Sequence, residues 1–218
     1  MALGSTAMPV VRRLLVATAL TALSVGGGVV AAGDAGSGDE PAAASTPLAS
    51  YDTSRVTILR TGFCDRVAED AVSAALGAEP EDAEAYGNGD RVRLASRIRD
   101  RAHEHGCSWT AEGTTAAAWV FAPPVTRATA GTLLRQARAE RGCEPVSRAP
   151  AYGEPSAGLV CTSSGSREVS FRGLFGDAWL VCTLTSEDVS AGQSPNSAID
   201  QAGRWCVAVA EAASGRTT

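Results

Sequence analysis

Six cysteines constrain the fold of this chain more than any other feature of its sequence. They occur at Cys64, Cys107, Cys143, Cys161, Cys182 and Cys206. An even set of cysteines in an exported chain favours disulfides over catalytic thiols. No two cysteines are spaced as Cys-x-x-Cys, so a zinc ribbon and a thioredoxin-like redox site both lack their minimum motif. We therefore predict three disulfides, with no metal ion and no cofactor.

Among the many possible connectivities we favour the sequential one, which pairs Cys64–Cys107, Cys143–Cys161 and Cys182–Cys206. Each of these bonds would close a loop of moderate length and join the end or face of a helix to a strand. Each would contribute about 2–4 kcal/mol, a large share of the net stability of a domain.

Residues 1–32 have the pattern of an export signal. Arg12 and Arg13 provide its positive charge, and residues 14–25 form a continuous apolar run. Small residues at 30–32 then offer a cleavage site. The apolar stretch is also close to the shortest that spans a membrane, so one uncleaved transmembrane anchor stays an alternative to a secreted protein.

The rest of the chain divides into a linker and one domain. Residues 33–50 are small and polar and include prolines, and such a segment cannot bury enough apolar area to offset chain entropy. We interpret it as a flexible linker. Residues 51–218 then form a single domain, which is long enough to bury a core.

The charge of the chain disfavours two classes of partner. The formal net charge is −5 at pH 7. Phosphate contacts need a basic surface, so neither a nucleic acid nor an anionic membrane surface is expected as a partner. All 19 basic residues are arginines, which we attribute to codon usage in a GC-rich genome rather than to binding.

Apolar periodicity predicts both helices and strands. The expected helices cover residues 65–76, 127–141 and a C-terminal segment that starts at 195 or 197. The expected strands cover residues 107–111, 116–122, 158–162, 168–174 and 178–184, with a loop at 79–90. Residues 91–101 fit either a strand or a helical segment, and we favour a strand at 91–95. This predicts an α+β fold, with helices packed on one face of a disulfide-stabilised antiparallel sheet.

The sequence also contains a faint internal repeat. The order Cys107, Trp119-Val120-Phe121, helix and Cys143 resembles the order Cys161, Trp179-Leu180-Val181, helix and Cys206. Such a repeat would give two strand–strand–helix halves packed over one sheet.

Candidate catalytic and metal-binding motifs are weak. His103 and His105 flank Glu104 and precede Cys107, but a cysteine used in a disulfide leaves only two ligands, so we expect a solvated surface. The acidic residues from Glu79 to Glu84 lack the spacing of a calcium loop. No Gly-x-Ser-x-Gly elbow is present, and we assign no catalytic residue.

The aromatic residues give the remaining candidate site. The four tryptophans lie near cysteines in expected strands and a helix, where core packing is their ordinary role, although an aromatic ligand cleft stays possible. In the segment 173–179, two glycines flank Leu174 and Phe175. We expect Phe175 to be exposed there and Phe175 with Trp179 to form a partner surface.

Cys64 stands at the head of a helix that ends in Ala75-Leu76-Gly77, and Cys107-Ser108-Trp109 follows. This pattern, over residues 62–122, resembles the domain of unknown function 3558 group of actinobacterial exported proteins and lipoproteins. The resemblance implies a secreted or envelope location, a bond from Cys64 to Cys107 and no known enzymatic activity. Lipid anchoring is not carried over, because no cysteine precedes Cys64.

The sequence thus favours a non-enzymatic cell-envelope module that binds a small molecule, a glycan or another envelope protein. A secreted hydrolase with an unrecognised active site is the alternative. A structural, membrane-associated protein is a third reading, if the N-terminal segment is not cleaved.

Overall fold

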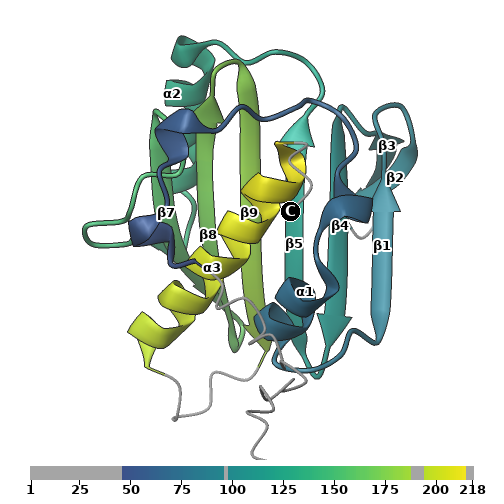
Figure 1. Ribbon diagram of the computed structural model, residues 1–218, viewed down its shortest axis with the longest axis vertical. Helices are drawn as coiled ribbons and strands as arrows, with labels where there is room; N and C mark the ends of the chain where they lie inside the picture. Colours follow the sequence, from purple (N-terminus) through teal and green to yellow (C-terminus); the bar gives the residue numbers. More distant parts are fainter. Residues whose placement is uncertain (1–45, 96–97, 188–193, 215–218) are drawn as a thin grey trace, which may run out of the picture. The chain divides into compact units, whose positions relative to one another are not determined.

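The computed structural model describes residues 46–95, 98–187 and 194–214. In these ranges the chain forms a seven-stranded antiparallel sheet, a two-stranded hairpin and three α-helices (Figure 1). The predicted α+β class and antiparallel sheet are confirmed. The predicted export signal and residues 33–45 of the predicted linker lie outside the described residues. No helix within the described ranges is long and apolar enough to cross a membrane.

The strands of the large sheet follow the order β1-β4-β5-β9-β8-β7-β6. Their bounds are β1 Asp82–Tyr86, β4 Glu104–Ala111, β5 Thr114–Phe121, β6 Cys143–Pro145, β7 Ser156–Ser163, β8 Ser166–Phe175 and β9 Ala178–Glu187. The hairpin consists of β2 (Arg91–Ala95) and β3 (Ile98–Arg101). The pairing of β5 with β9 joins an N-terminal and a C-terminal group of strands into one sheet.

The helices are α1 (Glu69–Leu76), α2 (Arg127–Arg138) and α3 (Pro195–Ala213). Their ends follow local chemistry. Helix α1 stops at Gly77, whose φ of 79° is left-handed and suits glycine. The Thr126 side chain accepts a hydrogen bond from the Thr129 backbone N–H at the start of α2. Three short 3-10 helices, Leu48–Ser50, Thr53–Arg55 and Cys64–Arg66, precede α1.

The helices cover both faces of the sheet. Helices α1 and α3 share one face with a large core cluster that includes Leu180 and Cys182 of β9, and Figure 1 shows α3 lying across the strands. Helix α2 packs in a second cluster with Trp179 and Val181. These residues alternate along one strand, so the two clusters lie on opposite faces. The prediction of helices on one face therefore holds for α1 and α3 only, because β9 is apolar on both of its faces and needs cover on each.

All three predicted disulfides are confirmed. Cys64 joins the turn before α1 to β4, with a Cα–Cα distance of 5.8 Å to Cys107. Cys182 joins β9 to Cys206 of α3, and both residues are fully buried. The third bond differs from expectation, because Cys143 and Cys161 are directly opposed on β6 and β7 and link two strands rather than a helix and a strand.

Several predicted element boundaries are wrong. The expected loop at 79–90 contains β1, where alanines alternate with acidic residues against the edge of β4. The expected helix at 65–76 is interrupted at Val67, which is extended and buried, so α1 starts only at Glu69. Leu48 belongs to the folded domain rather than to the linker, because its side chain is buried in the core beside α3. The strand expected at 91–95 is confirmed as β2.

The expected repeat is reproduced in the strands but not in the helices. Trp119-Val120-Phe121 of β5 and Trp179-Leu180-Val181 of β9 lie side by side, and Val120 is paired with Leu180. The helix that follows β5 packs on one face of the sheet, whereas the helix that follows β9 packs on the other. The two halves therefore do not pack alike.

Candidate functional site

The predicted partner surface at Phe175 and Trp179 is wrong, because both side chains are buried, with exposures of 4% and 2%. Phe175 lies on the α3 face of β8, where its ring meets Tyr152 edge-on at 5.1 Å between centroids. The glycine turn that follows is exposed, but strand alternation directs Phe175 inward. Trp179 lies on the opposite face and packs within the α2 cluster.

The histidine motif and the acidic stretch do not converge. His103 is exposed just before β4, His105 is partly buried, and Cys107 is bonded to Cys64. Asp82 and Glu84 are exposed on β1. Among the residues that the structure describes, no group of three His, Cys, Asp or Glu side chains is placed to hold a metal ion.

The four tryptophans form two pairs on opposite faces of the sheet. Trp109 and Trp205 meet edge-on at 5.5 Å on the α3 face, and the Trp205 indole N–H donates to the Ala117 carbonyl. Trp119 and Trp179 belong to the α2 face, where Trp119 is only partly buried. The expected core role thus fits Trp205 and Trp179, while Trp119 presents part of its ring to solvent.

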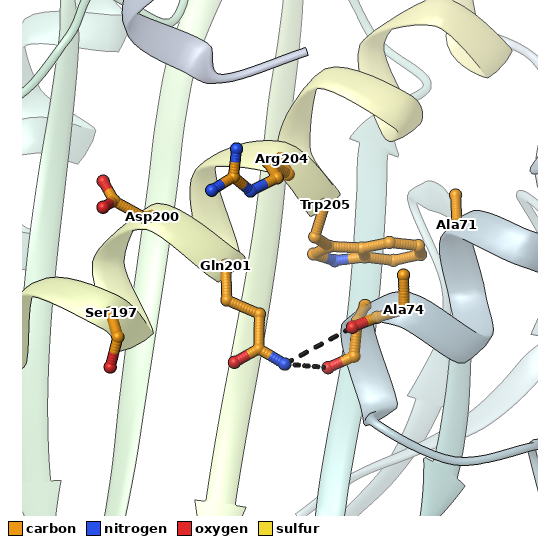
Figure 2. A pocket seen from close by; sticks show the side chains of 8 residues that line it. Ala71, Ala74, Ser197, Asp200, Gln201, Arg204 and Trp205 are labelled. Atoms are coloured by element: carbon orange, nitrogen blue, oxygen red, sulfur yellow. Dashed lines mark hydrogen bonds between the residues drawn. The ribbon is translucent and has the colours of Figure 1, made fainter. Parts of the chain in front are cut away.

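A first pocket lies between α1 and α3, with a volume of about 290 Å³ (Figure 2). Its walls carry alanines of α1, and Gln201 of α3 donates to the Ala75 and Ala74 carbonyls at 2.9 and 3.4 Å. These bonds satisfy carbonyls at the end of α1. Trp205, which Figure 2 shows beside them, is only 2% exposed. Gln201 and the Trp205 ring are thus used in helix packing.

A second hollow, of about 430 Å³, lies on the other face of the sheet. We call it the aromatic hollow. It is lined by Trp119, Phe121, Leu133, Gln136, Ala137, Ala139, Glu140, Arg172, Trp179 and Val181. Its volume falls within the range of small-molecule sites, which are typically concave and apolar with a few polar groups.

The position of α2 creates this hollow. The helix packs over β6, β7 and β8, so it covers only part of its face of the sheet. Trp119 lies on β5, directly opposite Val181 of β9 and beyond the strands that α2 covers. Leu133 and Ala137 of α2 then form one wall, and the neighbouring strands form the floor. An aromatic surface is left partly open to solvent at the edge of the helix.

Arg172 of β8 forms the charged end of the hollow. Its side chain is 15% exposed, and its Nη2 donates to Ser170 Oγ at 2.7 Å and lies 3.9 Å from Glu168 Oε1. Its Nε is buried and has no hydrogen-bond partner among the described residues. Burial raises the pKa of Glu168, and the charge of Arg172 opposes that rise. The guanidinium is therefore fixed in place by a serine and a carboxylate.

The opposite rim comes from α2 and the turn after it. Gln136 and Glu140 are exposed there and line the hollow. Glutamine both donates and accepts hydrogen bonds, a carboxylate only accepts, and a guanidinium only donates. The hollow thus combines an aromatic floor with polar groups of every hydrogen-bonding type, but the residues that line it include no hydroxyl or thiol nucleophile. Such a surface can contact a ligand through aromatic packing and hydrogen bonds.

Neither a known protein family nor a curated protein matches the chain. The resemblance to the domain of unknown function 3558 group stays a prediction from its cysteine and tryptophan pattern.

The sequence indicates an aromatic ligand cleft only in general terms and does not identify the residues that line the hollow. The signal that pointed toward it was the similarity of Trp119-Val120-Phe121 to Trp179-Leu180-Val181. These segments lie together because β5 pairs with β9. Arg172 and Gln136 carry no local motif, and only the packing of α2 on β8 brings them to the same hollow.

Proposed function

We propose that this protein is a non-enzymatic binding module of the cell envelope or the secreted space, and that the aromatic hollow is its ligand site. The observation that carries the proposal is an aromatic surface, formed by Trp119 and Phe121, that helix α2 leaves partly uncovered. Partly exposed aromatic side chains beside fixed polar groups are typical of ligand sites.

The three disulfides support a location outside the cytosol. Three bonds of this kind persist in an oxidising environment outside the cytosol. The export pattern of residues 1–32 and the family resemblance both favour the envelope or secretion. Attachment through one uncleaved N-terminal helix is the alternative location.

A hydrolase is the second candidate, and the raised pKa of Glu168 is the observation that favours it. However, Glu168 does not line the hollow, and its carboxylate is next to Arg172. The carboxylate of Glu140 raises the pKa of Glu168 further, but only Glu140 lines the hollow, so the two carboxylates do not share it as a pair. We therefore prefer binding, and expect that purified protein incubated with oligosaccharides or peptides releases no product.

A neutral aromatic dye tests whether the hollow takes a ligand. N-phenyl-1-naphthylamine should bind to the full chain and fluoresce, and Trp119→Ala should abolish most of this signal. Leu59→Ala is the matched control, because Leu59 is the exposed large apolar residue of the described chain, at 44% exposure. Equal dye binding by wild type and Trp119→Ala, or binding of neither this dye nor any oligosaccharide by wild type, would refute the proposal.

A further inference from the structure

We infer that the natural ligand of the aromatic hollow is an uncharged saccharide, whose ring packs on Trp119 and whose hydroxyls bond to the polar rim. This inference rests on the proposed function and names the ligand class for the same site. It follows from the mixture of groups that line the hollow, from their charges and from the shape of the sheet beside them.

The lining is only partly apolar. Trp119, Phe121 and Leu133 offer apolar surface, but Gln136 and the charged groups share the same hollow. A wholly apolar ligand would remove water from these polar groups and give no hydrogen bond in return, which is costly for each group. A ligand with polar groups around an apolar face avoids this cost.

Sugar hydroxyls match the rim chemically. Each hydroxyl both donates and accepts, so neighbouring hydroxyls of one ring can serve a donor-only group and an acceptor-only group together. Arg172 is donor-only and Glu140 is acceptor-only, while Gln136 is both. The C–H face of the ring can at the same time cover the exposed part of Trp119.

The charges favour a neutral ligand. Glu168 Oε1 lies 3.9 Å from Arg172 Nη2, and the charge of Glu140, which lines the same hollow as Arg172, also acts on this guanidinium. An anionic ligand would be repelled by these carboxylates. A cationic ligand would meet a buried guanidinium that cannot lose its charge at ordinary pH.

The floor extends beyond one ring. Ala117 and Thr115 alternate with core-facing residues of β5, so they lie on the same face as Trp119. Both are small and partly exposed. Because no large side chain of β5 blocks this direction, a second sugar unit can lie along the strand. Oligosaccharides should therefore bind more tightly than monosaccharides.

Calorimetric titration of the full chain tests the inference. The probes are maltohexaose, cellohexaose and mannohexaose as neutral glycans, hexagalacturonate as the acidic counterpart, and N-phenyl-1-naphthylamine as the apolar probe. At least one neutral hexasaccharide should bind. Trp119→Ala should weaken it about two- to tenfold, the loss expected for one aromatic contact. Leu59→Ala should leave binding unchanged.

Two further variants keep the test independent of folding. Trp119→Phe keeps an aromatic floor and should retain much of the affinity. Gln136→Ala changes an exposed residue of α2 and should weaken the binding of saccharides several-fold.

The outcomes of these titrations distinguish a wrong ligand class from a wrong ligand site. Dye binding without binding of any neutral saccharide would overturn the inference but leave the proposed function standing. Tighter binding of hexagalacturonate than of all neutral glycans would also overturn it. If neither the dye nor any glycan binds, the proposed function itself is wrong.

Discussion

Replacing Cys182 and Cys206 together with alanine tests how α3 is held against the sheet. The bond spans 24 residues, and in the chain-entropy treatment a cross-link of this length stabilises a fold by about 3.5 kcal/mol. Cys143–Cys161 spans 18 residues, which corresponds to about 3.2 kcal/mol. Loop length alone therefore predicts nearly equal losses for the two double variants.

The different burial of the two disulfides predicts different losses of stability for the two double variants. Both Cys182 and Cys206 are 0% exposed, so each alanine leaves a small void in the α3 cluster, at a cost of about 1 kcal/mol per site. Cys143 and Cys161 are partly exposed and leave no such void. We expect C182A/C206A to lose about 5.5 kcal/mol, and C143A/C161A about 3.2 kcal/mol.

Urea denaturation followed by circular dichroism measures both variants against the wild type. The expected difference between the variants is about 2 kcal/mol, well above the error of extrapolation when the m-values agree. Failure of C182A/C206A to fold, while C143A/C161A folds, would be the extreme form of the same result. Equal losses, or a larger loss for C143A/C161A, would refute the placement of the Cys182–Cys206 bond in the core.

Three further predictions concern local structure. Gly173→Ala should destabilise the domain severely in thermal melts, because the added Cβ would overlap the Tyr152 carbonyl oxygen; a melt like that of wild type would contradict the contact. Thr126→Ala should cost about 1 kcal/mol in urea, since it removes the cap of α2, and Thr126→Ser should restore most of it. Burial raises the pKa of Glu168 above 4.5, so the folded chain holds that proton more tightly than the unfolded chain, and stability falls as pH rises through the interval between the two values. Glu168→Gln should remove this fall from a pH series of urea midpoints, and an unaltered series would contradict the raised pKa of this partly buried carboxyl.

The cysteine pairing could be predicted because sequential bonds close moderate loops between elements that follow one another. Helix α2 could be predicted for a similar reason, since its apolar positions and its Thr126 cap are local signals. The end of α1 at Gly77 is local as well. In each case the residues that decide the structure are close in sequence.

Strand β1 could not be predicted in this way. Its residues Asp82–Tyr86 are largely exposed, and Asp82 and Glu84 are acidic. They form a strand only because the edge of β4 offers unpaired backbone groups. The side chains of β9 alternate between the two faces of the sheet, but in the sequence they form a continuous apolar run. Such a run does not say that both faces need a helix.

The aromatic hollow required tertiary information. Trp119 and Arg172 belong to strands that are separated by β9 in the sheet, and the wall of the hollow comes from α2. Phe175 shows the opposite error. Its flanking glycines suggested exposure, but its position in β8 places it among Tyr152 and the α3 core.

The indole N–H signals of the four tryptophans give the most direct test of the ligand site. Trp119 and Trp179 line the aromatic hollow, whereas Trp205 lines the pocket between α1 and α3 and meets Trp109 edge-on. In nitrogen-15 spectra of the full chain, N-phenyl-1-naphthylamine should shift the signals of Trp119 and Trp179 and leave the other two in place. Shifts confined to Trp205 and Trp109 would move the site to the other face of the sheet and contradict this account.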